Sequence, residues 1–292
     1  LIWSSEPDKS QHDQPVGSDL SNAAVKEADE QFGILMEWLS QSGRAADTNV
    51  IVISDHGYST IITTVNVEAL VREAGFPPSG EPGGVAVANN GGAALFYITD
   101  GDPDTAERLA VWLMGQEWCG TVTASDAVGE IPGTLPASVV GNQGPRGPEI
   151  TMSFRWSSDP NSAGYQGKVF STGGGPGRGQ HGSMSKHEMN NVMIAWGPGF
   201  KRGITLDVPS GNIDVAPTIL NLLGLPVGDA MDGRVLAEAL AGGPDPETVD
   251  WSNELYNTER RLKEKVYRQQ IKLSVVGGTT YVDQGNSTLG WR

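Results

Sequence analysis

The sequence predicts an α/β fold with a mostly parallel central sheet and helices on both of its faces. Three observations lead to this prediction. Residues 24–39 have the apolar spacing of an amphipathic helix, the β-branched run Val-Ile-Val-Ile follows at residues 50–53, and polar residues come directly after that run. A short apolar run without polar alternation is typical of a parallel strand covered on both faces. Doubly wound sheets bind ligands outside the carboxyl ends of such strands.

The first helix is predicted from apolar residues that recur at steps of three and four. These residues are Ala24, Val25, Ala28, Phe32, Leu35, Met36 and Leu39. Ser18 or Ser21 is a suitable N-cap, because a serine hydroxyl can accept a hydrogen bond from a free main-chain N–H of the first turn. Gly43 is expected to end the helix.

The middle of the chain continues the alternation of helices and strands. Short apolar runs bounded by turn residues predict strands, and longer periodic stretches with acidic residues in the first turn predict helices. The pattern predicts helices over residues 65–75 and 104–118, and strands over residues 93–98, 150–156 and 192–196. Asp214 is expected to cap a further helix that runs through Leu223 and ends at Gly224.

Two regions are rich in glycine and proline. Residues 129–148 hold nine such residues, Gly129, Pro132, Gly133, Pro136, Gly141, Gly144, Pro145, Gly147 and Pro148, and are predicted to form a loop. Near the end of the chain, alternating residues around Gly277-Gly278 predict a β-hairpin near residues 268–283. We expect residues 1–292 to belong to a single domain that contains both features.

Composition excludes several classes of protein. The chain of 292 residues has 20 Lys and Arg against 35 Asp and Glu, a formal charge of −15, and the surplus carboxylates are scattered. No basic stripe for nucleic acid and no basic amphipathic face for a membrane surface is visible. No apolar run approaches the roughly 20 residues that span a bilayer. The single cysteine, Cys119, cannot form an internal disulfide.

The opening residues, Leu1-Ile2-Trp3, are typical of the end of a buried strand and not of a signal peptide. We therefore expect the chain to be the C-terminal, N-terminally truncated part of a longer α/β domain. This expectation matters for function, because a further segment could supply part of an active site.

Histidine and aspartate residues gather in three short polar segments. Asp8 and His12 lie four residues apart, Asp55 and His56 are adjacent after the apolar run, and His181 lies between glycines in Gly-Gln-His-Gly. Zinc and manganese take mixed imidazole and carboxylate ligands. Five such groups exceed what one four-coordinate zinc takes from protein, and they are too few to close two sites. The pattern therefore predicts a two-metal centre with further ligands elsewhere.

Plainer interpretations of single residues remain open. Asp55-His56 could form a strand-end turn in which Asp55 caps the next helix, and His181 alone could lie on a surface loop. His187 lacks a motif partner and is expected in a solvated loop. Lys201-Arg202 could steer an anionic substrate, although two basic loop residues are usually only solvated. Asn212 and Asp214 are interpreted as a helix start.

Taken together, these segments resemble the type I phosphodiesterase / nucleotide pyrophosphatase family of the alkaline phosphatase superfamily. The resemblance rests on Val-Ile-Val-Ile-Ser-Asp-His-Gly at 50–57, Pro-Asp-x3-His at 7–12 and Gly-Gln-His-Gly at 179–182. Support comes from residues 197–203, 212–220 and 232–234. The resemblance implies an alkaline-phosphatase-like fold. Asp8, His12 and His181 would hold one metal, and Asp55 and His56 would hold the second. One departure is Gln11, where the family usually has glycine.

The resemblance implies a metal-dependent hydrolase of phosphodiester or nucleotide pyrophosphate bonds that acts through two metal ions and a covalent phosphoenzyme. The metals would be zinc, or alternatively manganese, and the substrate a small-molecule phosphate ester or nucleotide. The Thr or Ser nucleophile is expected upstream of this chain, which alone would be inactive.

The alternatives are a phosphomonoesterase or phosphonate hydrolase of the same superfamily, or a non-catalytic metal- or phosphoryl-binding relative. Family resemblance favours an extracytoplasmic location, either periplasmic or secreted. The sequence leaves the oligomeric state open.

Overall fold

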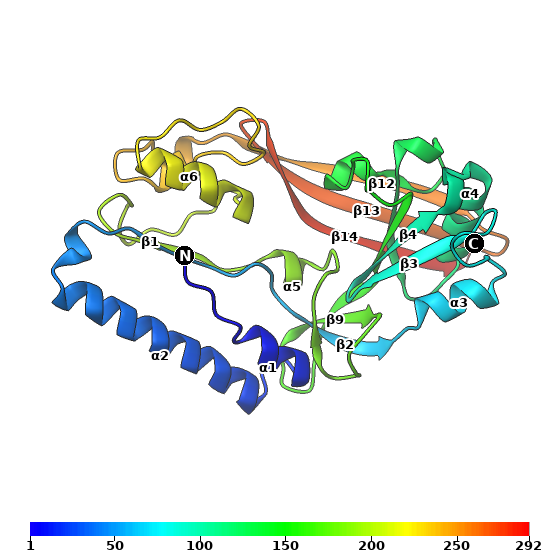
Figure 1. Cartoon of the computed structure of the whole chain (residues 1–292), viewed down its shortest axis with the longest axis horizontal. Helices are drawn as coiled ribbons and strands as arrows, with labels where there is room; N and C mark the ends of the chain where they lie inside the picture. The colour runs from blue at the N-terminus through cyan, green and yellow to red at the C-terminus, as the bar shows by residue number, and fades with distance from the viewer. Residues whose placement is uncertain (292) are drawn as a thin grey trace.

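A computed structural model of the chain describes residues 1–291, in which helices and several sheets alternate (Figure 1). The α-helices are α1 (Asp8–Asp13), α2 (Asp19–Gln41), α3 (Val67–Glu73), α4 (Pro103–Met114), α5 (Lys186–Met189) and α6 (Val215–Leu222). The first strands are β1 (Val50–Ile53), β2 (Ser59–Thr64), β3 (Val85–Asn90), β4 (Ala93–Ile98), β5 (Cys119–Ala124), β6 (Leu135–Pro136) and β7 (Ile150–Phe154). The later strands are β8 (Trp156–Pro160), β9 (Gln166–Ser171), β10 (Gly179–Gln180), β11 (Met193–Trp196), β12 (Trp251–Arg261), β13 (Lys265–Val276) and β14 (Thr279–Trp291). The α/β class predicted from the sequence is confirmed.

The strands form four sheets with the orders β1-β11, β10-β2-β9-β8, β3-β4-β7-β5-β6 and β12-β13-β14. The sequence predicted a mostly parallel sheet, and this prediction of strand direction is wrong. Within residues 1–291, the paired strands are antiparallel except for β2 with β9 and β5 with β6. The predicted parallel strand β1 pairs with β11 in antiparallel register, Val50 opposite Trp196. An apolar run indicates that both strand faces are apolar, but it does not indicate the direction of the partner strand.

Helix α2 begins and ends close to where the sequence predicts. The Ser18 hydroxyl accepts a hydrogen bond from the Ser21 N–H, as expected for an N-cap. Gly43, with a φ of 72°, adopts the left-handed conformation that follows many helix ends. The face of α2 is only partly covered, since Ala24 and Leu39 are buried whereas Trp38 is 54% exposed. In the view of Figure 1, β1 runs between α2 and α6.

The main hydrophobic core lies between α4 and the sheet that contains β5 and β7. Leu109 and Leu113 of α4 are fully buried with Val122, Met152 and Phe154 of the strands. Helix α4 ends at Met114, earlier than the predicted residue 118, because the chain turns at Gly115 and continues into β5. That strand was not predicted from the sequence, although all of its residues are buried.

The C-terminal sheet is larger than the predicted hairpin. Strands β13 and β14 pair over their length around the turn at Gly277 and Gly278, both with positive φ, and β12 adds a third strand. The exposed strand β12 was missed because its residues are largely polar. Residues 129–148 hold the two-residue strand β6, the short 3₁₀ turn η4 (Ala137–Val140) and connecting loop. None of the helices within residues 1–291 combines the length and apolar character that crossing a bilayer requires.

The first residues depart from expectation. Leu1, Ile2 and Trp3 form no strand and are exposed. An apolar tripeptide becomes a strand only when a neighbouring strand supplies hydrogen-bond partners, and none of the described strands pairs with it.

Candidate metal centre

Helix α1 places Asp8 and His12 on one face of a helix. Residues four apart on a helix are neighbours. Accordingly, the Asp8 Oδ1 and His12 Nε2 atoms are 3.7 Å apart. The departure at Gln11 leaves this spacing intact. The Gln11 side chain instead donates to the Ser21 hydroxyl at 3.3 Å, which ties α1 to α2.

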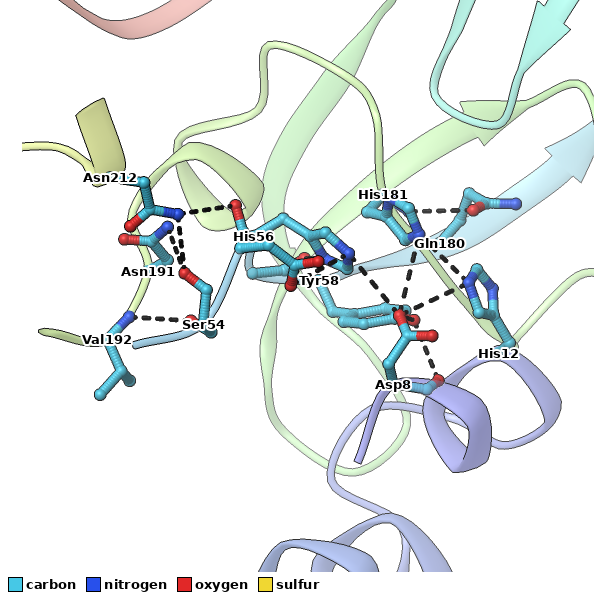
Figure 2. Close-up of polar contacts among 12 residues, drawn as sticks. Asp8, His12, Ser54, His56, Tyr58, Gln180, His181, Asn191, Val192 and Asn212 are labelled. Carbon is cyan, nitrogen blue, oxygen red and sulfur yellow. Dashed lines mark hydrogen bonds and ion pairs between the residues drawn. The ribbon is translucent and has the colours of Figure 1, made fainter. Parts of the chain in front are cut away.

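His181 reaches the same place from a distant part of the chain. It follows β10, which pairs with β2 and passes close to α1. This approach requires Gly179, because a Cβ there would lie 2.4 Å from the carbonyl oxygen of Gln11. The His12 and His181 Nε2 atoms are 3.1 Å apart, and His181 Nε2 is 3.8 Å from Asp8 Oδ1. Ligand atoms of Asp8, His12 and His181 all lie within 4.8 Å of one another (Figure 2).

Asp55 and His56 border this set from the end of β1. The His56 ring stacks on the His181 ring, with centroids 3.6 Å apart and an interplanar angle of 14°. His56 Nε2 is 3.6 Å from Asp8 Oδ1 and 3.6 Å from Asp55 Oδ1. The Asp55 side chain is 80% exposed. All five predicted residues therefore meet in one cluster, in which Asp55 lies at the solvent edge.

The chemistry of the donor set fits a divalent cation. One carboxylate and two imidazoles within 4.8 Å of one another form the mixed oxygen and nitrogen environment that zinc and manganese accept. The family resemblance implied this grouping, in which Asp8, His12 and His181 offer three ligands. Asp55 and His56 offer two more donor atoms beside them, which is half of a four-coordinate site.

Tyr58 is a member of the cluster that the sequence did not suggest. It lies two residues after His56, and its hydroxyl donates to Asp8 Oδ1 at 2.5 Å. Its ring packs edge-on against His12, His56 and His181. Its position next to the Asp-His-Gly segment is the only signal that could have pointed to it.

Burial shifts the pKa of two members of the cluster, His181 and Tyr58. Burial, followed by the nearby His56 and His12 rings, lowers the pKa of His181 to about 4. The neutral imidazole, which is the metal-binding form, is therefore present at neutral pH. Burial and the hydrogen bond to Asp8 raise the pKa of Tyr58 far above its ordinary value, so its hydroxyl keeps the proton that it donates.

A buried carboxylate holds the loop that carries His181. Glu188 of α5 is 2% exposed and accepts 2.7 Å hydrogen bonds from the main-chain N–H and the hydroxyl of Ser183. Burial is the largest influence on Glu188 and raises its pKa, against the opposing effect of the Ser59 and Ser183 hydrogen bonds. Glu188 thus joins α5 to the residues that follow His181.

The remaining candidates from the sequence lie outside the cluster. His187 is in α5, not a free loop, and its Nε2 is 3.0 Å from the Ser158 hydroxyl. The Lys201 ammonium donates to the Pro244 carbonyl. Asn212 donates to the Ser54 carbonyl at 2.9 Å, so it supports the turn before Asp55.

Asp214 has a different role from the predicted cap of α6. Its buried carboxylate accepts from the Gly211 N–H, the Arg234 N–H and the Tyr281 hydroxyl, and makes no side-chain cap to α6. The short 3₁₀ turn η5 (Asn212–Asp214) precedes α6. The Asp214 carboxylate therefore accepts hydrogen bonds from Gly211 at the start of that turn and from Tyr281 of β14.

Two solved structures are similar to this chain in fold. The chain resembles the murine ectonucleotide pyrophosphatase / phosphodiesterase 5, with 18% identity and a TM-score of 0.58 over 82% of this chain and 58% of the murine chain. The human ectonucleotide pyrophosphatase / phosphodiesterase 5 gives 16% identity and a TM-score of 0.59 over 83% of this chain and 58% of the human chain. The chain thus spans somewhat more than half the length of these relatives. No curated protein matches the sequence.

The fold is therefore alkaline-phosphatase-like. The sequence model of the type I phosphodiesterase / nucleotide pyrophosphatase family matches residues 1–127. This matched part contains Asp8, His12, Asp55 and His56, whereas His181 lies beyond it. The match covers less than half of the chain, and together with the shared fold it agrees with the resemblance seen in the sequence.

Proposed function

We propose that this protein is a metal-dependent hydrolase of phosphodiester or nucleotide pyrophosphate bonds. One observation carries the proposal. A carboxylate and two imidazoles, from residue positions 8, 12 and 181, bring their ligand atoms within 4.8 Å of one another at the positions that the family resemblance assigns to a metal. The family match over residues 1–127 supports the same class of reaction.

Asp8, His12 and His181 would hold one cation, and Asp55 and His56 would contribute to a second. Zinc, or alternatively manganese, would supply positive charge that stabilises the phosphoryl oxygens and activates a nucleophile. Asp8 and Asp55 contribute negative charge that offsets the cations. The His12, His56 and His181 rings contribute nitrogen donors. We assign no residue of this chain as the nucleophile of the expected phosphoenzyme.

The substrate is proposed to be a small phosphate ester or nucleotide. The scattered surplus of acidic residues, with a formal charge of −15, opposes binding of an extended polyanion. A compact phosphate ester held by cations is not subject to this bulk repulsion, because the local charge of the metal dominates. The ectoenzyme names of the two structural relatives favour an extracytoplasmic location.

Hydrolysis of bis-p-nitrophenyl phosphate by the full-length protein tests the proposal. The rate should be abolished by a chelator and restored by added zinc or manganese. His181→Ala should remove the metal-restored rate. His187→Ala is the matched control, because His187 bonds to Ser158 outside the cluster, and should retain it.

The possible outcomes separate the alternatives. An unchanged metal-restored rate in His181→Ala would contradict the ligand assignment. Tight metal binding without turnover of phosphodiesters, phosphomonoesters or phosphonates would support the non-catalytic relative instead. Preference for a phosphomonoester or phosphonate would place the protein elsewhere in the same superfamily.

A further inference from the structure

Tyr58 contacts the aspartate of the cluster through its hydroxyl group. The hydroxyl lies 2.5 Å from Asp8 Oδ1 and 3.0 Å from the Asp8 carbonyl oxygen. Asp8 Oδ1 is also the oxygen that lies 3.6 to 3.8 Å from Nε2 of His12, His56 and His181. The phenol therefore holds the same carboxylate oxygen that faces the three imidazoles (Figure 2).

The Tyr58 ring also orders the imidazoles. Its centroid lies 5.4 Å from those of His12 and His56 and 5.5 Å from that of His181. The interplanar angles of 76°, 62° and 75° make each contact edge-on. Such contacts fix ring orientation, and a tyrosine is well suited to this because it has only two side-chain torsions before its hydroxyl.

We propose that Tyr58 is a positioning residue of the metal centre. Its hydroxyl fixes the rotation of the Asp8 carboxylate, and its ring limits the tilt of the three histidines. The inference rests on the proposed function, because it assumes that the cluster binds a cation. Partners that orient metal ligands without touching the metal commonly change metal affinity by about 10–100-fold when they are removed.

The structure explains why the hydroxyl group has an effect separate from that of the ring. Tyr58→Phe keeps the three edge-on ring contacts and removes only the donor to Asp8. The Asp8 side chain is 46% exposed, so without this donor its carboxylate is free to rotate toward solvent. Binding a cation would then require the carboxylate to be ordered again, at a cost in affinity.

Cobalt binding to the purified protein is the test, because Co²⁺ replaces Zn²⁺ in such sites and its visible absorption reports ligand geometry. Wild type, Tyr58→Phe and Tyr281→Phe are titrated with Co²⁺ at pH 7.5. Tyr281→Phe is the matched control, since it also removes a tyrosine hydroxyl that donates to an aspartate, in this case the buried Asp214 at 2.9 Å. Urea unfolding of the metal-free proteins checks that each variant is folded.

We expect Tyr58→Phe to bind Co²⁺ about 10–100-fold more weakly, with an altered visible spectrum, while Tyr281→Phe keeps wild-type affinity and spectrum. Equal affinity and spectrum in wild type and Tyr58→Phe would overturn the positioning role. Absence of Co²⁺ binding by wild type would instead overturn the proposed function.

A second measurement on the wild-type protein does not depend on any variant folding. With ring-labelled tyrosine, the NMR signal of Tyr58 should move on Zn²⁺ addition while that of Tyr281 stays in place. A Tyr58 signal that does not respond to bound Zn²⁺ would also overturn the inference.

Discussion

The main-chain N–H of Gly57 donates a hydrogen bond of 2.7 Å to the carbonyl oxygen of Glu188. Gly57 directly follows His56. The Glu188 carboxylate accepts two hydrogen bonds from Ser183, which lies two residues after His181. One buried residue therefore connects the turn that carries His56 to the loop that carries His181, and fixes the two stacked rings relative to each other.

Substitution of Gly57 tests this connection. A Cβ at position 57 would lie 2.3 Å from the carbonyl oxygen of His187, so Gly57→Ala should push α5 away and cost about 1–3 kcal/mol. Gly33→Ala is the control, since nothing lies within 4 Å of a Cβ there and α2 should gain about 0.5–1 kcal/mol. Urea unfolding measures both. Equal stability of the two variants would show that α5 can move without cost.

The two aspartates should contribute differently to metal binding. Asp8 offers a ligand atom within 4.8 Å of those of both His12 and His181, whereas the 80% exposed Asp55 carboxylate forms an ion pair with His56. Asp8→Asn should therefore abolish high-affinity zinc binding, and Asp55→Asn should retain one bound ion. Calorimetric titration gives the stoichiometry of each variant. Loss of all binding in Asp55→Asn would show that the two ligand sets form a single site.

The free energy of unfolding of the metal-free protein should decrease as the pH is lowered, because of His181. Its pKa is lowered to about 4, mainly by burial, while an unfolded histidine has a pKa near 6.5. Between these values the unfolded chain binds a proton that the folded chain does not. Stability is thus fully present above about pH 6.5 and decreases as the pH falls toward about 4.

His181→Gln separates this effect from that of His187, whose pKa is lowered as well, first by burial and then by Lys186. Urea unfolding at pH 7.5 and pH 5 in the presence of a chelator should show a smaller pH-dependent loss of stability in the variant than in wild type. An identical loss in both proteins would mean that His181 is not the group responsible.

Arg234 is expected to be a structural residue, although it belongs to a segment that supports the family resemblance. Its guanidinium makes bonds of 2.6 and 2.9 Å to Glu238, which is 2% exposed. Arg234→Met would leave that carboxylate buried and unpaired, at a cost of about 3–5 kcal/mol. Arg268→Met removes an exposed pair with Glu259 and should cost about 0–1 kcal/mol. Similar losses in urea unfolding would refute this distinction.

Local patterns predicted some elements well. The N-cap at Ser18 and the apolar spacing of α2 depend on neighbouring residues only, so both could be inferred from sequence. The directions of the sheets could not. Whether β1 pairs in parallel or antiparallel depends on β11, more than 130 residues later, and no local feature of β1 encodes it.

The candidate site was predictable where chemistry is carried by residue type and spacing. Asp8 and His12 share a helix face, and the structure brings His181 to them as the resemblance implied. Tyr58 was not predictable in this way, because its role comes from contacts with side chains that converge only in three dimensions. The buried Glu188 network was hidden for the same reason.

The separation of His12 from His181 by 169 positions also has a kinetic consequence. Contacts between distant parts of a chain form slowly, because closing the intervening loop costs entropy before the contact can stabilise the chain. A cation that needs both rings cannot bind until β10 has docked beside α1. Metal uptake should therefore be a late event in folding. The rate of metal binding during refolding would then report the rate at which the native topology is completed.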